Sequence, residues 1–378
     1  MGVFTVDDAL RAAAIDAGHE LGVFEALASP LTFEQLAERT QLQPTHRLAA
    51  LVDALISLGA LARAGSLIIR GAITARSAMP MPGGWGAIAD VIRTHTPLAV
   101  AEVEIARRYQ RHLVVASAPA ARDVAAMLVA MRGASSVDAS IGSASIDALR
   151  AVDIGGGAGA YTRALLAADP HARVTLVDMP EVIALAREEL ADIIDRVDFV
   201  AGDARGLDGV DNVGGDTGTR AFAMGGVRTE SIDARPVGRR ETRIGGDATR
   251  RFDLAIVANV LHLHPPATCA ELCASAARSV APGGIVAIVD LRRGTLEGEM
   301  FALNMALYTD GGSVYAVDQV GAWLREAGLD AIEERRIASA PEMVVVLARR
   351  PHADSVGEGD DDVPGDIVRD LSARGELG

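Results

Sequence analysis

Asp153-Ile154-Gly155-Gly156-Gly157-Ala158-Gly159 is the most informative segment of this 378-residue chain. The apolar run at residues 151–154 is typical of a buried strand, and residues 161–168 after the glycines have a helical pattern. Glycines in such a turn let a ligand approach the backbone closely and allow positive φ angles. The segment therefore predicts a strand, a ligand-binding turn and a helix in succession.

The chain that follows this turn repeats the same alternation. Apolar runs that predict strands occur at residues 174–177, 197–201, 254–257, 285–289 and 343–347, with helical stretches between them. Such alternation is typical of an open, mostly parallel sheet with helices on both faces. The sequence thus predicts an α/β domain at residues 146–350, with an inserted glycine-rich loop at about 207–248 and an acidic tail at 351–378.

The N-terminal part of the chain is expected to be mostly helical. Helices are predicted at residues 6–21, after the cap Thr32 with Gln35 at its third position, and at about 44–61, followed by a short strand at 66–70. This order is typical of a winged helix, here residues 1–98. DNA binding is one interpretation, but acids outnumber arginines in this region, which favours a protein–protein module. Residues 99–145 then predict a helical linker with two stretches, 101–114 and 118–131.

The composition excludes several kinds of chemistry. All 36 basic residues are arginines, so a Schiff-base lysine, a pyridoxal-phosphate anchor and a P-loop lysine are impossible. The net charge of −15 argues against broad nucleic-acid binding. The N-terminal segment carries acids where a signal peptide needs basic residues, and no uninterrupted apolar run reaches the roughly 18 residues of a membrane helix. A cytoplasmic protein without a membrane partner is expected.

Two cysteines, Cys269 and Cys273, lie four residues apart in a helical pattern. A metal site would need further ligands at this spacing, and a single helix face is a poor geometry for a disulfide. Both are interpreted as reduced thiols of a cytosolic protein, and no metal site is expected.

Three aspartates lie at the ends of successive predicted strands. Asp153 precedes the glycine turn, where a carboxylate disfavours a pyrophosphate and favours an ammonium group. Asp178 ends the second strand, where it can bind both hydroxyls of a ribose, and Asp203 ends the third, near where an adenine amino group could lie. A ligand with a ribose and an amine but no phosphate fits this set, which points to S-adenosylmethionine.

A nicotinamide-dependent oxidoreductase is a second interpretation. Gly155, Gly157 and Ala160 satisfy the dinucleotide pattern G-x-G-x-x-A. The charge of Asp153 and the position of the turn behind a helical domain oppose it. A transcriptional regulator with a ligand-sensing domain is a third interpretation, which the acidic winged helix opposes.

These motifs together resemble the caffeic-acid/hydroxyindole-type O-methyltransferases, including their bacterial relatives in natural-product pathways. The resemblance extends over about residues 6–350 and is carried by residues 152–159, Val177-Asp178-Met179-Pro180, Ala201-Gly202-Asp203, Asn259-Val260-Leu261-His262 and Ala281-Pro282-Gly283-Gly284. It implies a Rossmann-like class I methyltransferase domain, preceded by a winged-helix dimerisation domain that partly closes the active site of its partner in a homodimer. The linker at residues 99–145 would contribute to the acceptor pocket.

The resemblance also implies a reaction. S-adenosyl-L-methionine would be the methyl donor and S-adenosyl-L-homocysteine the product. The acceptor would be a hydroxyl of a small aromatic or polyketide-like secondary metabolite. Residues implied in donor binding are Asp153, Gly155, Gly157, Gly159, Asp178, Met179, Asp203, Ala204 and Asn259.

Further residues are implied in catalysis and acceptor binding. His262 falls on the position of the general base that takes the proton of the acceptor, at the edge where open α/β sheets place their sites. Asp290 falls on an acid that orients this histidine. His264 is a second candidate for the base. The acceptor pocket would include Asn304, Met305 and Tyr308, whereas Phe301 is interpreted as core packing.

One position departs from the pattern of the family. A second acid is expected after the glycine pair Gly311-Gly312, and Val314 stands there instead. The alternatives to O-methylation with His262 as base are therefore transfer to a carbon or nitrogen atom, and a family member that has lost methyl transfer.

Overall fold

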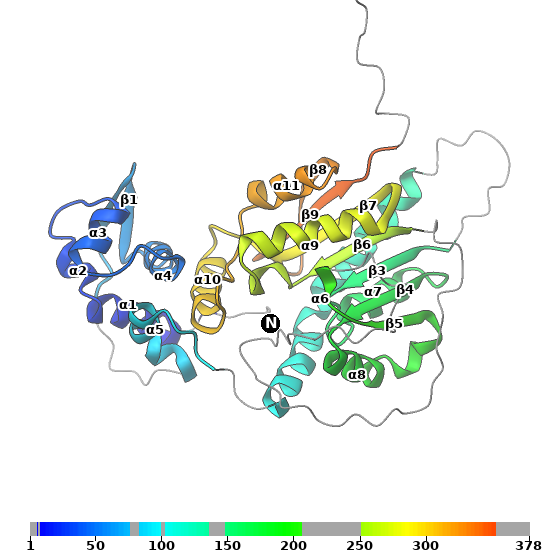
Figure 1. Ribbon diagram of the computed structural model, residues 1–378, viewed down its shortest axis with the longest axis horizontal. Coiled ribbons are helices and arrows are strands. Elements are labelled where there is room, and N and C mark those ends of the chain that lie inside the picture. The colour runs from blue at the N-terminus through cyan, green and yellow to red at the C-terminus, as the bar shows by residue number, and fades with distance from the viewer. Residues whose placement is uncertain are drawn as a thin grey trace, which may run out of the picture.

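The computed structural model describes residues 6, 8–75, 83–99, 103–135, 148–205 and 251–352 (Figure 1). A mostly helical N-terminal unit lies at one end of the elongated molecule, and a larger α/β unit forms the rest. Helix α10 lies between the two (Figure 1). The insertion predicted at 207–248 and nearly all of the acidic tail fall outside the described residues.

The N-terminal unit has the helix order that the sequence predicts. Its elements are α1 (Asp8–Glu20), α2 (Val23–Ala26), α3 (Phe33–Arg39), α4 (His46–Ser57), the hairpin β1 (Leu61–Ala64) and β2 (Leu67–Arg70), η1 (Gly83–Ala87) and α5 (Ile88–Thr94). The predicted cap of α3 is present, because Gln35 N donates to Thr32 Oγ1 at 3.3 Å and Thr32 N donates to Gln35 Oε1 at 2.9 Å.

Helix α4 ends earlier than the sequence predicts. Gly59 takes a φ of +74°, its amide donates to the Ile56 carbonyl, and the Ala60 amide donates to the Leu55 carbonyl at 2.9 Å. This pair of bonds is a Schellman motif, which ends a helix at a left-handed glycine. Leu61, predicted as the last helical residue, therefore begins β1.

The α/β unit is built on a seven-stranded sheet of order β5-β4-β3-β6-β7-β9-β8. Its strands are β3 (Arg150–Ile154), β4 (Arg173–Asp178), β5 (Val197–Ala201), β6 (Phe252–Ala258), β7 (Val280–Leu291), β8 (Asp330–Arg336) and β9 (Met343–Arg349). Strands β3 to β7 pair in parallel, and β9 runs antiparallel to both of its neighbours. The order reverses at β3, so the carboxyl ends of β3 and β6 form the switch point where such sheets bind ligands.

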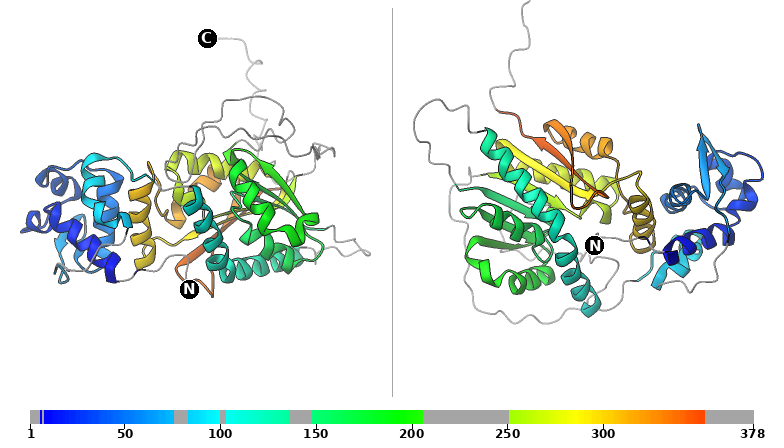
Figure 2. Two further views of the ribbon diagram at one scale, coloured as in Figure 1. Left: turned by 90° about the horizontal axis from the view of Figure 1, so that it is seen from below. Right: turned by 180° about the vertical axis from the view of Figure 1, so that it is seen from behind.

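Helices cover both faces of the sheet (Figure 2). Buried residues of α6 (Val103–Ser135), α7 (Ala160–Ala168) and α8 (Pro180–Glu189) form one core with the sheet. Buried residues of α9 (Pro266–Ser279) and α11 (Val317–Glu326) form a second core on the other face. The remaining elements are η2 (Ala191–Arg196), η4 (Leu261–Leu263) and α10 (Leu296–Tyr308). The predicted doubly covered α/β domain is confirmed.

The linker is one helix rather than the two predicted stretches. Helix α6 runs through Pro119, and its buried side chains pack against α7; they are Ala120, Ala121, Val124, Ala125 and Leu128. Between Gln110 and Arg132 it is long and apolar enough to cross a membrane, by length and composition alone. A third of this window is buried inside the structure, and the buried row belongs to the core of the α/β unit.

Strand β8 has no counterpart among the predicted strands. Its sequence, residues 330–336, is mostly charged and exposed. Because it lies at the edge of the sheet and pairs only with β9, no apolar run marks it.

Candidate active site

The glycine turn between β3 and α7 has the backbone that its sequence predicts. Gly155, Gly157 and Gly159 take φ angles of +69°, +56° and +88°, which residues with side chains rarely adopt. A Cβ on Gly155 would also lie 2.6 Å from Val260 Cγ2. The nearest atom to a Cβ on Gly157 would be Gln110 Oε1, at 3.2 Å. The turn thus packs closely against Val260 on one side and lies next to Gln110 of α6 on the other.

Asp178 and the glycine turn are brought together as predicted. The Asp178 side chain at the end of β4 accepts a hydrogen bond from Gly157 N at 2.8 Å and one from Met179 N at 2.7 Å. Burial raises the pKa of Asp178, and the two amides act in the opposite direction. Met179 is the N-cap residue of α8, so its role toward the donor stays a prediction.

Asp153 lies beneath the turn rather than on its surface. Its side chain is 1% exposed, and Oδ2 accepts bonds from the amide of Thr162 at 3.1 Å and from its hydroxyl at 2.7 Å. Burial raises the pKa of Asp153 to about 6, while the Thr162 bonds lower it. The side chain therefore anchors the first turn of α7, and the predicted contact with an ammonium group stays a prediction.

These two carboxylates give the turn an uncompensated negative field. Among the residues that the structure describes, no arginine or histidine forms an ion pair with Asp153 or Asp178. A ligand that carries positive charge would relieve the cost of burying both acids. S-adenosylmethionine, with its sulfonium and ammonium groups, fits this donor set.

An expected result follows for Asp153. The pKa of Asp153 is higher in the folded protein than its unfolded value of 3.8. The free energy of unfolding therefore falls as the pH rises from the unfolded pKa to the folded pKa. Asp153→Asn keeps an oxygen for Thr162 and removes the charge. In urea unfolding without donor, the variant should be more stable than the wild type at pH 7 by up to about 3 kcal/mol, and less dependent on pH between 4 and 6. A variant that is less stable at pH 7 would contradict a buried, unpaired carboxylate.

The third aspartate is exposed and paired. The Asp203 carboxylate accepts bonds from Arg205 Nε at 3.0 Å to each oxygen, and this pair lowers the pKa of Asp203. Ala204 is fixed through its carbonyl, which accepts a bond from Ser275 Oγ at 2.9 Å. Asp203 lies two residues beyond the end of β5, whose last residue, Ala201, is paired with Asp178 of β4. Contact with an adenine stays a prediction, since Arg205 occupies the carboxylate.

Asn259 closes the other side of the turn. It takes a φ of +58° and its amide donates to the Val289 carbonyl at 2.8 Å. The hydroxyl of Tyr161, in the first turn of α7, is buried beside it, and the side chain of Asn259 interacts with that hydroxyl. The side-chain oxygen of Asn259 has no hydrogen-bond partner among the described residues, and because such buried groups are costly it is a candidate to bond a ligand. Tyr161 was missed because its place in an apolar helix pattern is typical of the core.

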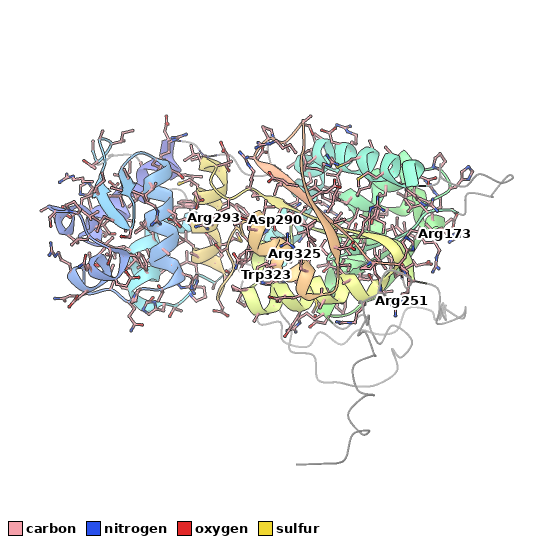
Figure 3. The ribbon with its side chains drawn as sticks, turned by 90° about the horizontal axis from the view of Figure 1, so that it is seen from above. Arg173, Arg251, Asp290, Arg293, Trp323 and Arg325 are labelled. Atoms are coloured by element: carbon pink, nitrogen blue, oxygen red, sulfur yellow. The ribbon has the colours of Figure 1, made fainter. Side chains whose placement is uncertain are left out.

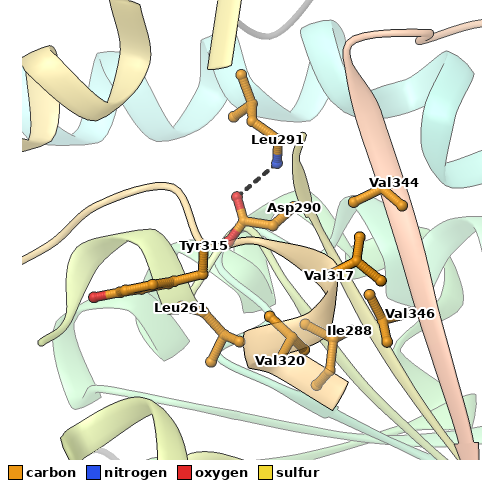
Figure 4. A pocket seen from close by; sticks show the side chains of 9 residues that line it. All are labelled: Leu261, Ile288, Asp290, Leu291, Tyr315, Val317, Val320, Val344 and Val346. Atoms are coloured by element: carbon orange, nitrogen blue, oxygen red, sulfur yellow. Dashed lines mark hydrogen bonds between the residues drawn. The ribbon is translucent and has the colours of Figure 1, made fainter. Parts of the chain in front are cut away.

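His262 and Asp290 form the pair that the sequence predicts. His262 lies in η4 after β6, is 6% exposed, and its Nδ1 is 2.6 Å from Asp290 Oδ1. The second carboxylate oxygen accepts a bond from His262 N at 3.2 Å, and Leu291 N donates to Oδ1 at 2.8 Å (Figure 4). Because Nδ1 is engaged, Nε2 is the nitrogen that can take a proton.

His264 is less suited to the role of base. Burial lowers the pKa of His264, and its electrostatic neighbours are His262, Arg205 and Asp203. Its carbonyl accepts bonds from Tyr315 and Cys269. Asp290 is the acid that orients an imidazole ring at this edge of the sheet, and it bonds His262.

Helix α10 forms an apolar wall beside His262. The ring of Phe301 lies edge-on to the His262 ring, with centroids 4.9 Å apart. Its neighbours in this cluster are Leu291, Ala302, Met305 and Val314. Phe301 is buried in the core, as the sequence predicts, and it also contacts the His262 ring. Met305 lies in the same cluster, and its role in the acceptor pocket stays a prediction.

The other face of α10 belongs to the N-terminal unit. Met300, Leu303, Ala306 and Leu307 are buried in the core of that unit. Tyr308 packs partly against this core, and a Cβ on Gly84 would lie within contact of its hydroxyl, so its place in the acceptor pocket stays a prediction. Asn304 is half-buried between the two faces, and its role stays a prediction.

Val314, which stands where the family has a second acid, is buried and cannot orient a histidine. Its carbonyl accepts a bond from Arg293 Nη1 at 3.3 Å. Arg293 also pairs with Asp53 of α4 and, at 3.1 Å, with Glu299 of α10. Figure 3 shows Arg293 at the junction of the two units, beside α10. The segment around Val314 is therefore held through its backbone.

Helix α6 supplies residues that no motif marks. Gln110 reaches the glycine turn, and Arg111 pairs with Glu188 at 3.2 Å and Glu189 at 3.0 Å at the end of α8. These pairs hold α6 across the turn. No local pattern could have indicated them, because the partners are more than 70 residues away.

Comparison with known proteins bears on this geometry. Residues 123–211 match the model of the O-methyltransferase domain. The chain is 25% identical to the tetracenomycin polyketide synthesis 8-O-methyl transferase TcmO of Streptomyces glaucescens over 355 residues, which cover 88% of this chain and 91% of that protein. It is 28% identical to the 3-hydroxy-5-methyl-1-naphthoate 3-O-methyltransferase of Streptomyces sahachiroi over 196 residues, or 50% of this chain and 46% of that protein.

A solved structure supports the fold. An O-methyltransferase family 2 protein from Planctomyces limnophilus, in complex with apigenin, aligns with a TM-score of 0.56 at 18% identity. The alignment covers 93% of this chain and 99% of that one. With the sheet order and the glycine turn, these matches identify an O-methyltransferase domain in a chain that is similar, over most of its length, to a bacterial polyketide O-methyltransferase.

Proposed function

We propose that the protein methylates a hydroxyl group of a small aromatic, polyketide-like natural product, with His262 as general base and Asp290 as the acid that orients it. The observation that carries this proposal is the 2.6 Å contact between His262 Nδ1 and Asp290 Oδ1, at the same sheet edge as the glycine turn. Two similar proteins, TcmO and the naphthoate O-methyltransferase, are named for the O-methylation of acceptors of this class, which supports the proposed acceptor.

The residues of the turn would hold the donor. Bound S-adenosylmethionine supplies an activated methyl group on its sulfonium sulfur. Asp178 would accept bonds from the ribose hydroxyls, and the field of Asp153 and Asp178 would favour the positive charge. Asn259 would give its unpartnered side-chain oxygen to the same ligand. Together these residues would fix the methyl group near the end of β6.

His262 would then act on the acceptor. Asp290 keeps the proton of the imidazole on Nδ1, so Nε2 can take the proton of the acceptor hydroxyl as the oxygen attacks. The wall of Phe301 and Met305 would pack against a flat acceptor and keep water from the oxyanion. Since Val314 replaces the second acid, proton transfer in this scheme depends on one carboxylate.

A panel of phenols tests this function. Apigenin, a hydroxynaphthoate and an anthraquinone phenol, each incubated with S-adenosylmethionine, should yield a methylated product and an equal amount of S-adenosylhomocysteine for at least one acceptor. Amines and carbon nucleophiles of similar size should give none. Methylation confined to amines or carbon acids would favour the alternative chemistry instead.

The donor site gives a second expected result. Asp178→Ala removes the carboxylate that would bind the ribose and that holds Gly157 N, so the affinity for S-adenosylhomocysteine should fall by about 1–3 kcal/mol in calorimetry. Asp198→Ala, on the exposed side of the neighbouring strand β5, is the matched control and should bind normally. Unchanged affinity in a folded Asp178→Ala protein would remove this residue from the site.

We also propose that residues 1–98 mediate a homodimer, as the resemblance implies. Sedimentation at micromolar concentration should give a dimer, and a dimer partner would close the acceptor side of the site. An active, stable monomer at that concentration would contradict this assembly.

A further inference from the structure

The turn that carries His262 is braced by a second stretch of chain. We name residues 261–265 the catalytic turn and residues 311–315 the bracing segment. A Cβ on Gly312 would lie 2.3 Å from the His262 carbonyl oxygen, and a Cβ on Gly311 would lie 3.0 Å from Pro265 Cβ. The two segments are therefore in direct backbone contact, and the glycine pair is what permits it.

Tyr315 bonds the catalytic turn at its C-terminal end. Its hydroxyl donates to the His264 carbonyl and lies 3.4 Å from the Gly311 carbonyl oxygen. The ring is fixed by Trp323 of α11, with centroids 5.0 Å apart in an edge-to-face arrangement. Tyr315 also lines a small apolar cavity with Asp290 and Leu261, and its hydroxyl is directed away from Asp290 (Figure 4). Burial raises the pKa of Tyr315, so its hydroxyl remains a donor at neutral pH.

Cys269 bonds the same turn from helix α9. Its thiol lies 3.2 Å from the Leu261 carbonyl oxygen and 3.5 Å from the His264 carbonyl oxygen. Burial raises the pKa of Cys269, which keeps the thiol protonated and able to donate. The carbonyls on both sides of His262 are thus bonded by the buried thiol of Cys269 and the partly buried hydroxyl of Tyr315.

We propose that Tyr315 and Cys269 are positioning residues that fix the backbone of the catalytic turn and thereby aim His262 Nε2 at the acceptor. A second acid would hold the imidazole ring, but Val314 stands at its position. Tyr315 and Cys269 instead hold the backbone that carries the ring. Asp290 holds Nδ1 and the amide of His262, whereas the carbonyls of the catalytic turn are held by Tyr315 and Cys269. This inference rests on the proposed role of His262 as base.

Single-turnover rates on a phenolic acceptor test the proposal. Tyr315→Phe removes only the hydroxyl and Cys269→Ala only the thiol. Each should slow methyl transfer by about 10-fold, the order expected for a small misplacement of a reacting group. Affinity for S-adenosylhomocysteine should not change. The rate of each variant should recover as the pH rises, because an ionised phenol no longer needs the base.

Matched controls separate positioning from loss of packing. Cys273 lies one turn along α9 in the same core, and within the described chain no residue of the catalytic turn bonds its thiol. Cys273→Ala should therefore keep the wild-type rate. Cys269→Ser restores a donor and should recover most of the rate lost in Cys269→Ala.

Double variants decide the outcome. In a His262→Ala background, Tyr315→Phe and Cys269→Ala should change the rate by less than about 2-fold, because a residue that acts through another has no effect once that one is gone. Equal slowing in both backgrounds, or no slowing in either single variant, would overturn the proposal. A wild-type rate in His262→Ala itself would instead reject the proposed base.

Discussion

His262→Ala is expected to lower the rate of methyl transfer to a hydroxyl by about 10²–10⁴-fold, the usual contribution of a positioned general base. Affinity for S-adenosylhomocysteine should stay nearly unchanged, because donor contacts would come from the glycine turn and Asp178 rather than from η4. A neutral hydroxyl is a poor nucleophile toward a sulfonium carbon, so the loss should shrink as the pH approaches the pKa of the acceptor. Single-turnover kinetics over a range of pH would measure this.

His264→Ala is the matched comparison for this variant. His264 lies two residues further along the same turn and burial lowers its pKa, whereas Asp290 bonds His262, so the loss of His264 should cost far less. If His262→Ala keeps the wild-type rate while chemistry limits turnover, proton abstraction by this residue is wrong. The enzyme would then work by holding donor and acceptor in line.

Arg47→Ala is expected to cost about 2–4 kcal/mol in the free energy of unfolding, because it would leave buried carbonyls without a donor. Arg47 of α4 is 3% exposed, and its guanidinium donates to the carbonyls of Ala306 and, at 3.0 Å, Thr309. These carbonyls lie at the C-terminal end of α10, where a cation also interacts well with the helix dipole. Urea unfolding would measure the loss.

A matched exposed arginine serves as the control. Arg63 pairs with Asp53 in the same unit at 2.7 Å but its side chain is half exposed, so Arg63→Ala should cost less than about 1 kcal/mol. Arg47→Ala should in addition slow methyl transfer, since α10 carries Phe301 and Met305 beside His262. Equal stability of the two variants would contradict a clamping role for Arg47.

Local signals explain why much of the fold could be predicted. The strands around the glycine turn are short apolar runs, and Thr32 with Gln35 is a capping pattern within four residues. The charged edge strand β8 and the uninterrupted α6 could not be predicted in this way. Pro119 is typical of a helix boundary, and only packing of the following turns against α7 shows that the helix continues.

The residues of the candidate site also fall into two groups, those that the order of elements predicts and those whose positions depend on tertiary packing. Asp178 and Asp290 lie at the carboxyl ends of strands and His262 follows one, so their convergence at one sheet edge could be predicted from the order of elements. The burial of Asp153 under α7 and the turn of Tyr308 toward the N-terminal unit depend on tertiary packing. Tyr315 and Cys269 contact the catalytic turn through backbone carbonyls, which leave no mark in the residue pattern.

The bond formed in the product tests the central claim most directly. A phenolic acceptor from the panel would be incubated with S-adenosylmethionine labelled with carbon-13 in the methyl group, and the purified product examined by NMR. The proposed function predicts a labelled methoxy carbon coupled to the aromatic carbon that carried the hydroxyl. A label on carbon or nitrogen, or no transfer to any phenol while donor still binds, would contradict it.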